Sequence, residues 1–143
     1  MYTDMNTVYK ISSVQRIVDG DTIDVLINLG FDVTISKRIR LSGIDTPECR
    51  TTDLIEKKFG ILAKQRLSEW FKKETVNQLQ LRCKTENDKY GRVLAEIWVE
   101  DNGKWINVNQ WMVDNYYAAM YDGQNKNDIQ DQHLSNREKL KKV

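Results

Sequence analysis

Apolar and polar residues alternate along the first third of the chain, which is the pattern of β-strands. Between residues 22 and 29 the alternation is broken only by Leu26. A period of two indicates a strand with one buried face and one solvated face. Apolar residues at 14–18 lead into this strand through an Asp-Gly turn. A second turn, marked by Gly30 and Asp32, precedes a third strand predicted from Val33 to about Ile44.

The pattern then changes to a helical period. Apolar residues recur about every 3.6 positions between Asp53 and Glu74, which predicts the longest helix. Asp53, with Glu56 three residues later, resembles a helix N-cap. The remaining predicted elements are strands at 79–83 and 93–99, a hairpin turn at 101–104, a short helix capped by Asn107 and running through Asn115, and a polar helix from about Asp128.

The order of these elements predicts an α+β fold. Five short antiparallel strands with one helix between the third and the fourth match the OB-fold, a five-stranded Greek-key β-barrel, which here would carry three helices. The alternative is a generic α+β sheet domain. At 143 residues, the chain is expected to form one domain over residues 1–143.

Composition narrows the class of protein. The chain is 40% hydrophobic and 30% charged, as is usual for a soluble globular domain. No apolar run approaches the roughly 20 residues of a membrane span, so no membrane partner is expected. The first residues lack the apolar region of a signal peptide, so the chain as written is expected to be cytoplasmic, or secreted if it is a trimmed mature form. The net charge of +1 does not by itself mark a nucleic-acid binder.

Cysteine and histidine usage excludes several kinds of site. The chain has two cysteines, Cys49 and Cys83, with no CxxC and no Cys/His pair at zinc spacing. Two free thiols are favoured, and a disulfide is the alternative. The single His133 cannot form a histidine metal site alone, and no GxSxG motif accompanies it.

Three polar stretches stand beside predicted strands: DGDTIDV at 19–25, RIRLSGIDTPE at 38–48 and NDKYGR at 87–92. Each alone is typical of an ordinary turn or charged loop. Together they supply carboxylates at Asp21 and Asp45, with Asp19 nearby. Oxygen ligands without histidine or thiolate suit Ca²⁺ or Mg²⁺.

The same stretches supply the other parts of a phosphodiesterase. Arg40 and Arg92 carry planar guanidinium groups, which grip phosphate through paired hydrogen bonds. Glu48 is a further carboxylate suited to activating water as a general base. Such an enzyme needs these groups because charge builds on the phosphoryl oxygens as water attacks.

The motifs VDGDTIDV at 18–25, RLSGIDTPE at 40–48 and DKYGR at 88–92, followed by Tyr121 and QHL at 132–134, stand in a fixed order over roughly residues 14–135. In this respect the chain resembles the staphylococcal nuclease (thermonuclease) family. The resemblance implies an OB-fold barrel with three helices and a Ca²⁺-dependent endonuclease that acts on DNA and RNA. It implies cleavage of the P–O5′ bond, which leaves 3′-phosphate ends.

The resemblance also assigns roles to single residues. Asp21 and Asp45 would bind the metal by carboxylate and Thr46 by its backbone carbonyl, with Asp19 behind them. Glu48 would be the general base, either directly or by orienting the attacking water. Arg40 and Arg92 would clamp the phosphate, with Arg92 near the leaving oxygen. The nucleotide pocket would consist of Asp88, Lys89, Tyr90 and Tyr121.

Some positions depart from the family pattern. Gly123 stands where the family has a second pocket tyrosine, which bears on nucleotide binding rather than on the chemistry. The alternative function is a non-catalytic OB-fold module that binds single-stranded nucleic acid. The presence of Asp21, Arg40, Asp45, Glu48 and Arg92 together favours catalysis. The expected substrate is single-stranded or frayed DNA or RNA, and the expected state is a monomer.

Overall fold

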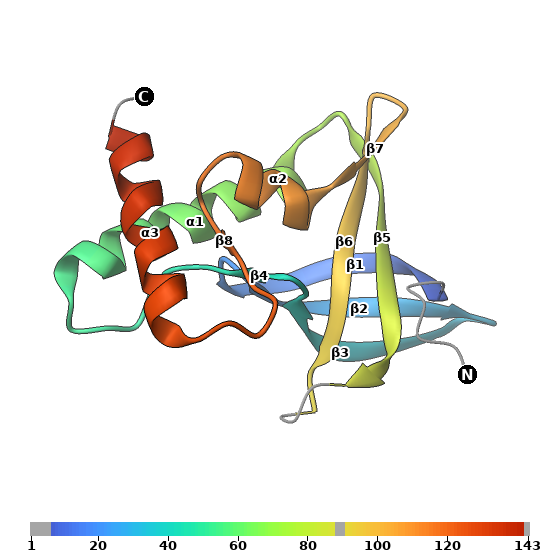
Figure 1. Ribbon diagram of the computed structural model, residues 1–143. Coiled ribbons are helices and arrows are strands. Elements are labelled where there is room, and N and C mark those ends of the chain that lie inside the picture. Colours follow the sequence, from blue (N-terminus) through green and yellow to red (C-terminus); the bar gives the residue numbers. More distant parts are fainter. Residues whose placement is uncertain (1–6, 88–90, 142–143) are drawn as a thin grey trace.

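The computed structural model describes residues 7–87 and 91–141. Within them, five strands close into a barrel: β1 (Thr7–Asp19), β2 (Thr22–Gly30), β3 (Val33–Leu41), β5 (Val76–Asn87) and β6 (Val93–Asp101). Their order is β3-β2-β1-β5-β6, and β3 and β6 also pair with each other. β5 and β6 cross in front of the first three strands (Figure 1). The OB-fold prediction is therefore confirmed.

The pair that closes the barrel differs from the expectation of purely antiparallel strands. β3 and β6 run parallel, with Ile39 opposite Val93, Arg40 opposite Leu94 and Leu41 opposite Ala95. The four other neighbouring pairs of the barrel are antiparallel. Closure thus places the end of β3 next to the beginning of β6.

The barrel interior is filled by alternate residues of its strands. On β2, Ile23, Val25 and Ile27 are buried, as the period of two predicted. Fully buried side chains of the other strands complete this core. β1 begins at Thr7, earlier than expected, because its first residues pair with β5 and its later ones with β2. This double pairing is a non-local contact that periodicity does not reveal.

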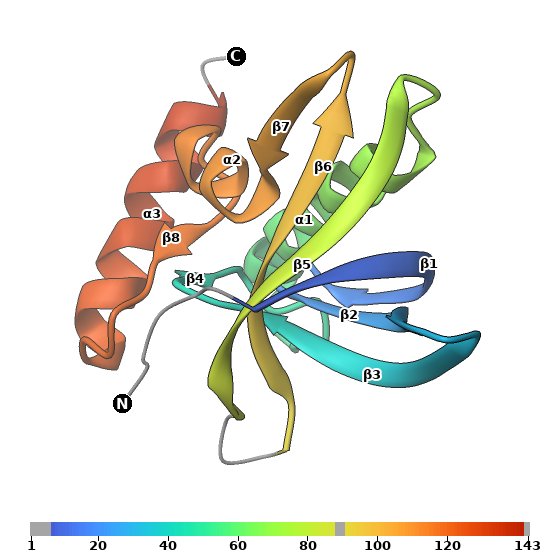
Figure 2. The same cartoon turned by 90° about the vertical axis from the view of Figure 1, so that its right-hand side faces the viewer.

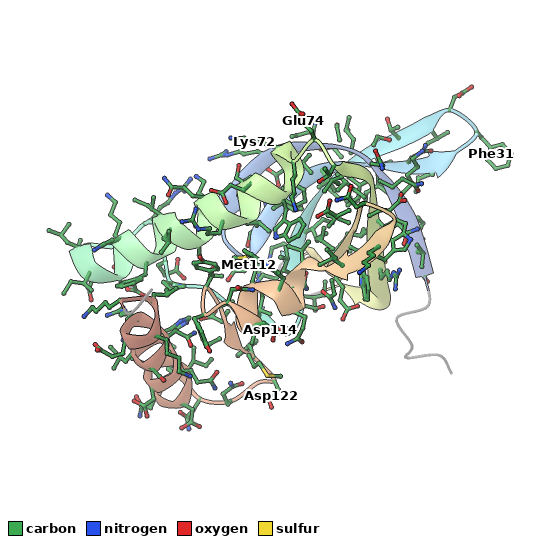
Figure 3. The ribbon with its side chains drawn as sticks, turned by 90° about the horizontal axis from the view of Figure 1, so that it is seen from above. Phe31, Lys72, Glu74, Met112, Asp114 and Asp122 are labelled. Carbon is green, nitrogen blue, oxygen red and sulfur yellow. The ribbon has the colours of Figure 1, made fainter. Side chains whose placement is uncertain are left out.

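In the described part of the chain, three helices lie outside the barrel: α1 (Leu54–Lys72), α2 (Val108–Asp114) and α3 (Lys126–Lys141). The predicted N-cap of α1 is confirmed, because Asp53 Oδ1 accepts hydrogen bonds from the amides of Ile55 and Glu56 at 3.0 and 3.2 Å. Buried α1 side chains and Met112 of α2 join the barrel core. Figure 3 shows Met112 beneath α1.

Three short strands are the remaining elements among the described residues. β7 (Lys104–Asn107) forms the predicted hairpin with β6. β4 (Ile44–Asp45) pairs with β8 (Ala119–Met120), beside α3 (Figure 2). This small sheet was not predicted as a separate element. It fixes the segment that carries Asp45.

The β2–β3 hairpin ends in an exposed aromatic side chain. Phe31 is 99% exposed and has a positive φ of 54°, and Figure 3 shows it at the tip of the hairpin. No helix among the described residues is long and apolar enough to span a bilayer.

Candidate active site

The polar residues from the first two motifs meet at one end of the barrel, where β2 begins and β3 ends. Thr22 is the register partner of Arg40, and the Leu41 amide donates to the Asp21 carbonyl at 2.8 Å. The DGDT turn and the end of β3 are therefore held side by side by backbone pairing.

The buried Asp21 carboxylate connects this turn to residues 45–48, which we call the DTPE loop. Its Oδ1 accepts from the Thr22 hydroxyl at 3.0 Å, and its Oδ2 accepts from the Thr46 amide at 3.1 Å. Asp21 is 9% exposed. A buried carboxylate that accepts two hydrogen bonds has a fixed orientation, so the turn presents a preset oxygen pair.

Arg40 lies between the two aspartates. Its Nη2 is 3.5 Å from Asp21 Oδ2 and 3.6 Å from Asp45 Oδ1, while Nη1 donates to the Leu41 carbonyl at 2.8 Å. One oxygen of each carboxylate thus faces the same guanidinium nitrogen. The geometry brings two acidic groups and one cation into a single polar centre.

The other Asp45 oxygen is held by a residue to which the sequence assigned no role. Oδ2 lies 2.8 Å from Nε2 of His133, a buried residue of α3. The QHL motif was the one signal that connected His133 to the site. Nothing in the local spacing shows that it contacts a residue 88 positions earlier.

Glu48 follows this centre on the DTPE loop. Its pKa is raised, first because neighbouring protein removes water from the carboxyl group and then because Asp19, Asp21 and Asp45 repel its charge. Glu48 is nonetheless exposed as a residue. A carboxylate with a raised pKa is a stronger base than an ordinary one. Because Glu48 is exposed, water can also reach it.

The next residue, Cys49, has an unreactive thiol. Burial, followed by a hydrogen bond with Asp19 and the charge of that carboxylate, raises the thiol pKa to about 11. The thiol is therefore protonated near neutral pH and is a poor nucleophile. Cys49 and Cys83 are both free thiols, as the sequence favoured.

A pocket of about 720 Å³ opens over this centre. Its walls include Arg40, Asp45 and Glu48, and also Arg92, which directly precedes β6, and Tyr121, which follows β8. The structure thus brings Arg92 and Tyr121 to the same cavity as the two motifs. Gly123 lines it too, at a φ of 95°, so no ring stands at that position. Three residues predicted for the nucleotide pocket, Asp88, Lys89 and Tyr90, lie outside the described residues.

No cluster of three or more His, Cys, Asp or Glu side chains within residues 7–87 and 91–141 is arranged to hold a metal. The predicted donors comprise two carboxylates and a backbone carbonyl, so they do not amount to such a cluster. The hydroxyl oxygen of the buried Thr46 has no hydrogen-bond partner in the described part of the chain. The donor chemistry is that of a hard, oxygen-preferring cation.

Comparison with known proteins gives consistent matches. Thermonuclease of Staphylococcus intermedius is 39% identical over 90 residues, covering 62% of this chain and 48% of the relative. Micrococcal nuclease of Shigella flexneri is 35% identical over 113 residues, covering 76% of this chain and 56% of the relative. Endonuclease YncB of Bacillus subtilis is 34% identical over 92 residues, covering 62% of this chain and 39% of the relative. The chain spans about half the length of the curated relatives it matches.

A family model described as "Staphylococcal nuclease homologue" matches residues 38–142, which is most of the chain and includes the DTPE loop, β6 and α3. Together with the barrel and the polar centre at its end, this match shows that the chain belongs to the staphylococcal nuclease homologue family.

Proposed function

We propose that this protein is a calcium-dependent endonuclease that hydrolyses the P–O5′ bonds of DNA and RNA and leaves 3′-phosphate ends. The observation that carries the proposal is the shared cavity. Arg40, Asp45, Glu48 and Arg92 line one pocket, and Asp21 is joined to it through Arg40 and Thr46. The names of the relatives support nuclease chemistry.

The residues present fit a hard cation. Asp21 Oδ2 and Asp45 Oδ1 lie 3.5 and 3.6 Å from the same Arg40 nitrogen, Nη2, so the two carboxylates stand close together. The Thr46 backbone carbonyl is proposed to complete the protein ligands, with Asp19 behind them. Ca²⁺ accepts such a set because it tolerates irregular geometry and takes further ligands from water. When bound, it would neutralise charge on the scissile phosphate.

Glu48 is proposed as the general base. Its raised pKa makes the carboxylate a better proton acceptor, and its exposure lets water reach it. The attacking water would give its proton to Glu48, while Arg40 and Arg92 donate hydrogen bonds to the phosphoryl oxygens. Arg92 is assigned to the leaving 5′ oxygen.

Tyr121 is proposed as the stacking face for a base, with Asp88, Lys89 and Tyr90 completing the nucleotide pocket. Tyr121 is 42% exposed and lines the cavity, so a ring face is available to substrate. Stacking requires an unpaired base, which favours single-stranded or frayed substrates. One domain and a monomer suffice for this chemistry.

Digestion of plasmid and single-stranded DNA in Ca²⁺, Mg²⁺ or EDTA tests the proposal. We expect cleavage in Ca²⁺, weak activity in Mg²⁺, which demands a tighter octahedral site, and none in EDTA. Analysis of the product ends should show 3′-phosphate. Full activity in EDTA would contradict the metal site. Binding without cleavage in every condition would indicate the non-catalytic OB-fold module instead.

A further inference from the structure

We propose that a groove between α1 and β1 binds the sugar–phosphate backbone of the substrate strand beyond the catalytic pocket. This α1–β1 groove lies between residues 12–18 and the α1 face that carries Ile61, Lys64, Ser68 and Lys72. The inference rests on the proposed nuclease function, because it identifies where the remainder of a long substrate is held.

Two adjoining cavities make the groove continuous. One has a volume of about 630 Å³ and the other about 490 Å³, and both are lined by Ile17, Ser68 and Lys72. On α1 the lining residues recur at intervals of three or four, so they form one face of the helix. The result is an extended trough rather than an isolated pit.

The α1–β1 groove begins next to the proposed catalytic pocket, which is the cavity of about 720 Å³ described above. Glu48 lines the catalytic pocket, and the next two residues, Cys49 and Arg50, line the groove. Lys64 and Cys49 line the same part of the groove. Lys64 is also close enough for its charge to oppose in part the rise of the Cys49 pKa that burial and Asp19 cause. Lys64 therefore stands at the junction, close to the backbone that carries the proposed base.

The charge of the groove suits a polyanion. Among the residues that the structure describes, its walls carry four cations, Arg16, Arg50, Lys64 and Lys72, and one carboxylate, Glu69. Glu69 is already paired with Arg66 at 2.7 Å. Within the described residues none of the four cations is in an ion pair. The whole chain carries a net charge of only +1, so this concentration of positive charge is local.

The groove also offers apolar surface beside its cations. Ile61, 40% exposed on α1, lies one turn before Lys64, and Ile17 and Val18 form part of the opposite wall. A trough that combines cations with apolar side chains fits a single strand, whose phosphates are charged and whose bases are flat and apolar. An acidic peptide would need the cations but would leave this apolar surface uncovered.

The test compares two double variants with the same change in net charge. Lys64→Glu with Lys72→Glu alters the groove. Lys57→Glu with Lys104→Glu alters exposed residues outside both cavities. Dissociation constants are measured by fluorescence anisotropy in EDTA for labelled thymidine oligonucleotides of about 3 and about 15 nucleotides. The longer one lies within the range of about 4–16 nucleotides that one OB-fold covers. Thermal melting confirms that each variant is folded.

We expect the groove variant to bind the longer oligonucleotide on the order of tenfold more weakly, with trinucleotide affinity unchanged. Its plot of log affinity against log salt should flatten by about 0.7 for each lost phosphate contact. The control variant should change little. Equal losses in both variants would indicate net charge rather than a groove, and equal losses for both lengths would place the lysines at the catalytic pocket. Either result overturns the inference.

Two further outcomes separate the inference from its premises. Wild-type protein that binds through the groove but cleaves nothing would refute the nuclease proposal and leave the groove intact. A 15-residue poly-glutamate peptide that competes as well as the oligonucleotide would refute the nucleic-acid assignment. Such competition would indicate an acidic protein partner.

Discussion

At the scale of single residues, the centre depends on carboxylates and guanidinium groups that neighbours hold in place. Asp45 has one oxygen near Arg40 and the other near His133. Asp21 accepts hydrogen bonds from Thr22 and Thr46. Groups that are already oriented need little rearrangement as charge develops, which is the main source of electrostatic stabilisation in enzymes.

Replacing Glu48 with glutamine should separate binding from chemistry. The amide keeps the shape of the side chain but cannot accept the proton from water, so kcat should fall by about 10²–10⁴-fold. Calorimetry should show nearly unchanged metal and nucleotide binding. A rate close to wild type, together with normal binding, would remove Glu48 from the role of base.

Replacing Arg92 with lysine keeps the positive charge but loses the paired donors of the guanidinium group. We expect kcat to fall by about 10²–10³-fold, the usual cost of one oriented donor to transition-state charge. The melting temperature should stay near that of wild type. A variant that is less stable but equally active per folded molecule would show that Arg92 supports the fold instead of the phosphate.

At the scale of elements, α1 approaches the DTPE loop unusually closely. A Cβ atom at Gly60 would lie 2.3 Å from the Glu48 carbonyl oxygen and 2.9 Å from the Cys49 amide nitrogen. Both contacts are with backbone, which cannot rotate away as a flexible side chain can. The helix therefore sets the position of the loop that carries the proposed base.

Gly60→Ala should accordingly reduce both stability and activity. Alanine favours helices over glycine by about 1 kcal/mol, but overpacking of this kind costs about 1–3 kcal/mol and would displace Glu48. Chemical denaturation and kcat measure the two effects. Lys57→Ala, at an exposed position of α1, is the control and should change neither. A more stable and fully active Gly60→Ala protein would show that the contact does not position the loop.

Local signals located most of these elements, and contacts distant in sequence account for the rest. Asp53 and Asn107 cap α1 and α2 as predicted, because a cap depends on residues two or three positions away. The sheet of β4 and β8 has two residues in each strand, too few for a period to show. The contact of His133 with Asp45 is likewise absent from any local pattern.

The predicted site likewise combines residues that are close in sequence with residues that only the fold brings together. The motifs placed Arg40, Asp45 and Glu48 close together because they lie within nine residues on one strand end and its loop. Arg92 and Tyr121 were connected with them only by resemblance, and the shared pocket now supplies the spatial relation. Their individual roles remain proposals to be tested by the variants above.

At the scale of the whole molecule, the proposed catalytic pocket collects residues from β3, the DTPE loop, β6, the segment after β8, and α3. The open cavity and the exposed Tyr121 ring suit a strand whose bases are already unstacked. Opening a duplex costs a few kcal/mol per flipped nucleotide, and binding of a paired substrate would have to offset this cost.

Denatured or A–T-rich DNA should therefore be cut faster than G–C-rich duplex. The Tyr121→Ala variant should lose much of this preference, because base stacking contributes about 1–3 kcal/mol. Tyr116→Ala is a matched control, since Tyr116 is similarly exposed but does not line the catalytic pocket. Initial rates on the three substrates provide the measurement. Equal rates for wild type on all of them would remove the stacking role.

The contact of α3 with β4 has a consequence for the newly made chain. Asp45 leaves the ribosome 88 residues before its partner His133, and β3 awaits the parallel partner β6 for more than fifty residues. Contacts so distant in sequence form late, because loop-closure entropy opposes them. The proposed catalytic centre would thus be completed only after α3 has been synthesised, long after the segments that carry Asp21, Arg40 and Asp45 have left the ribosome.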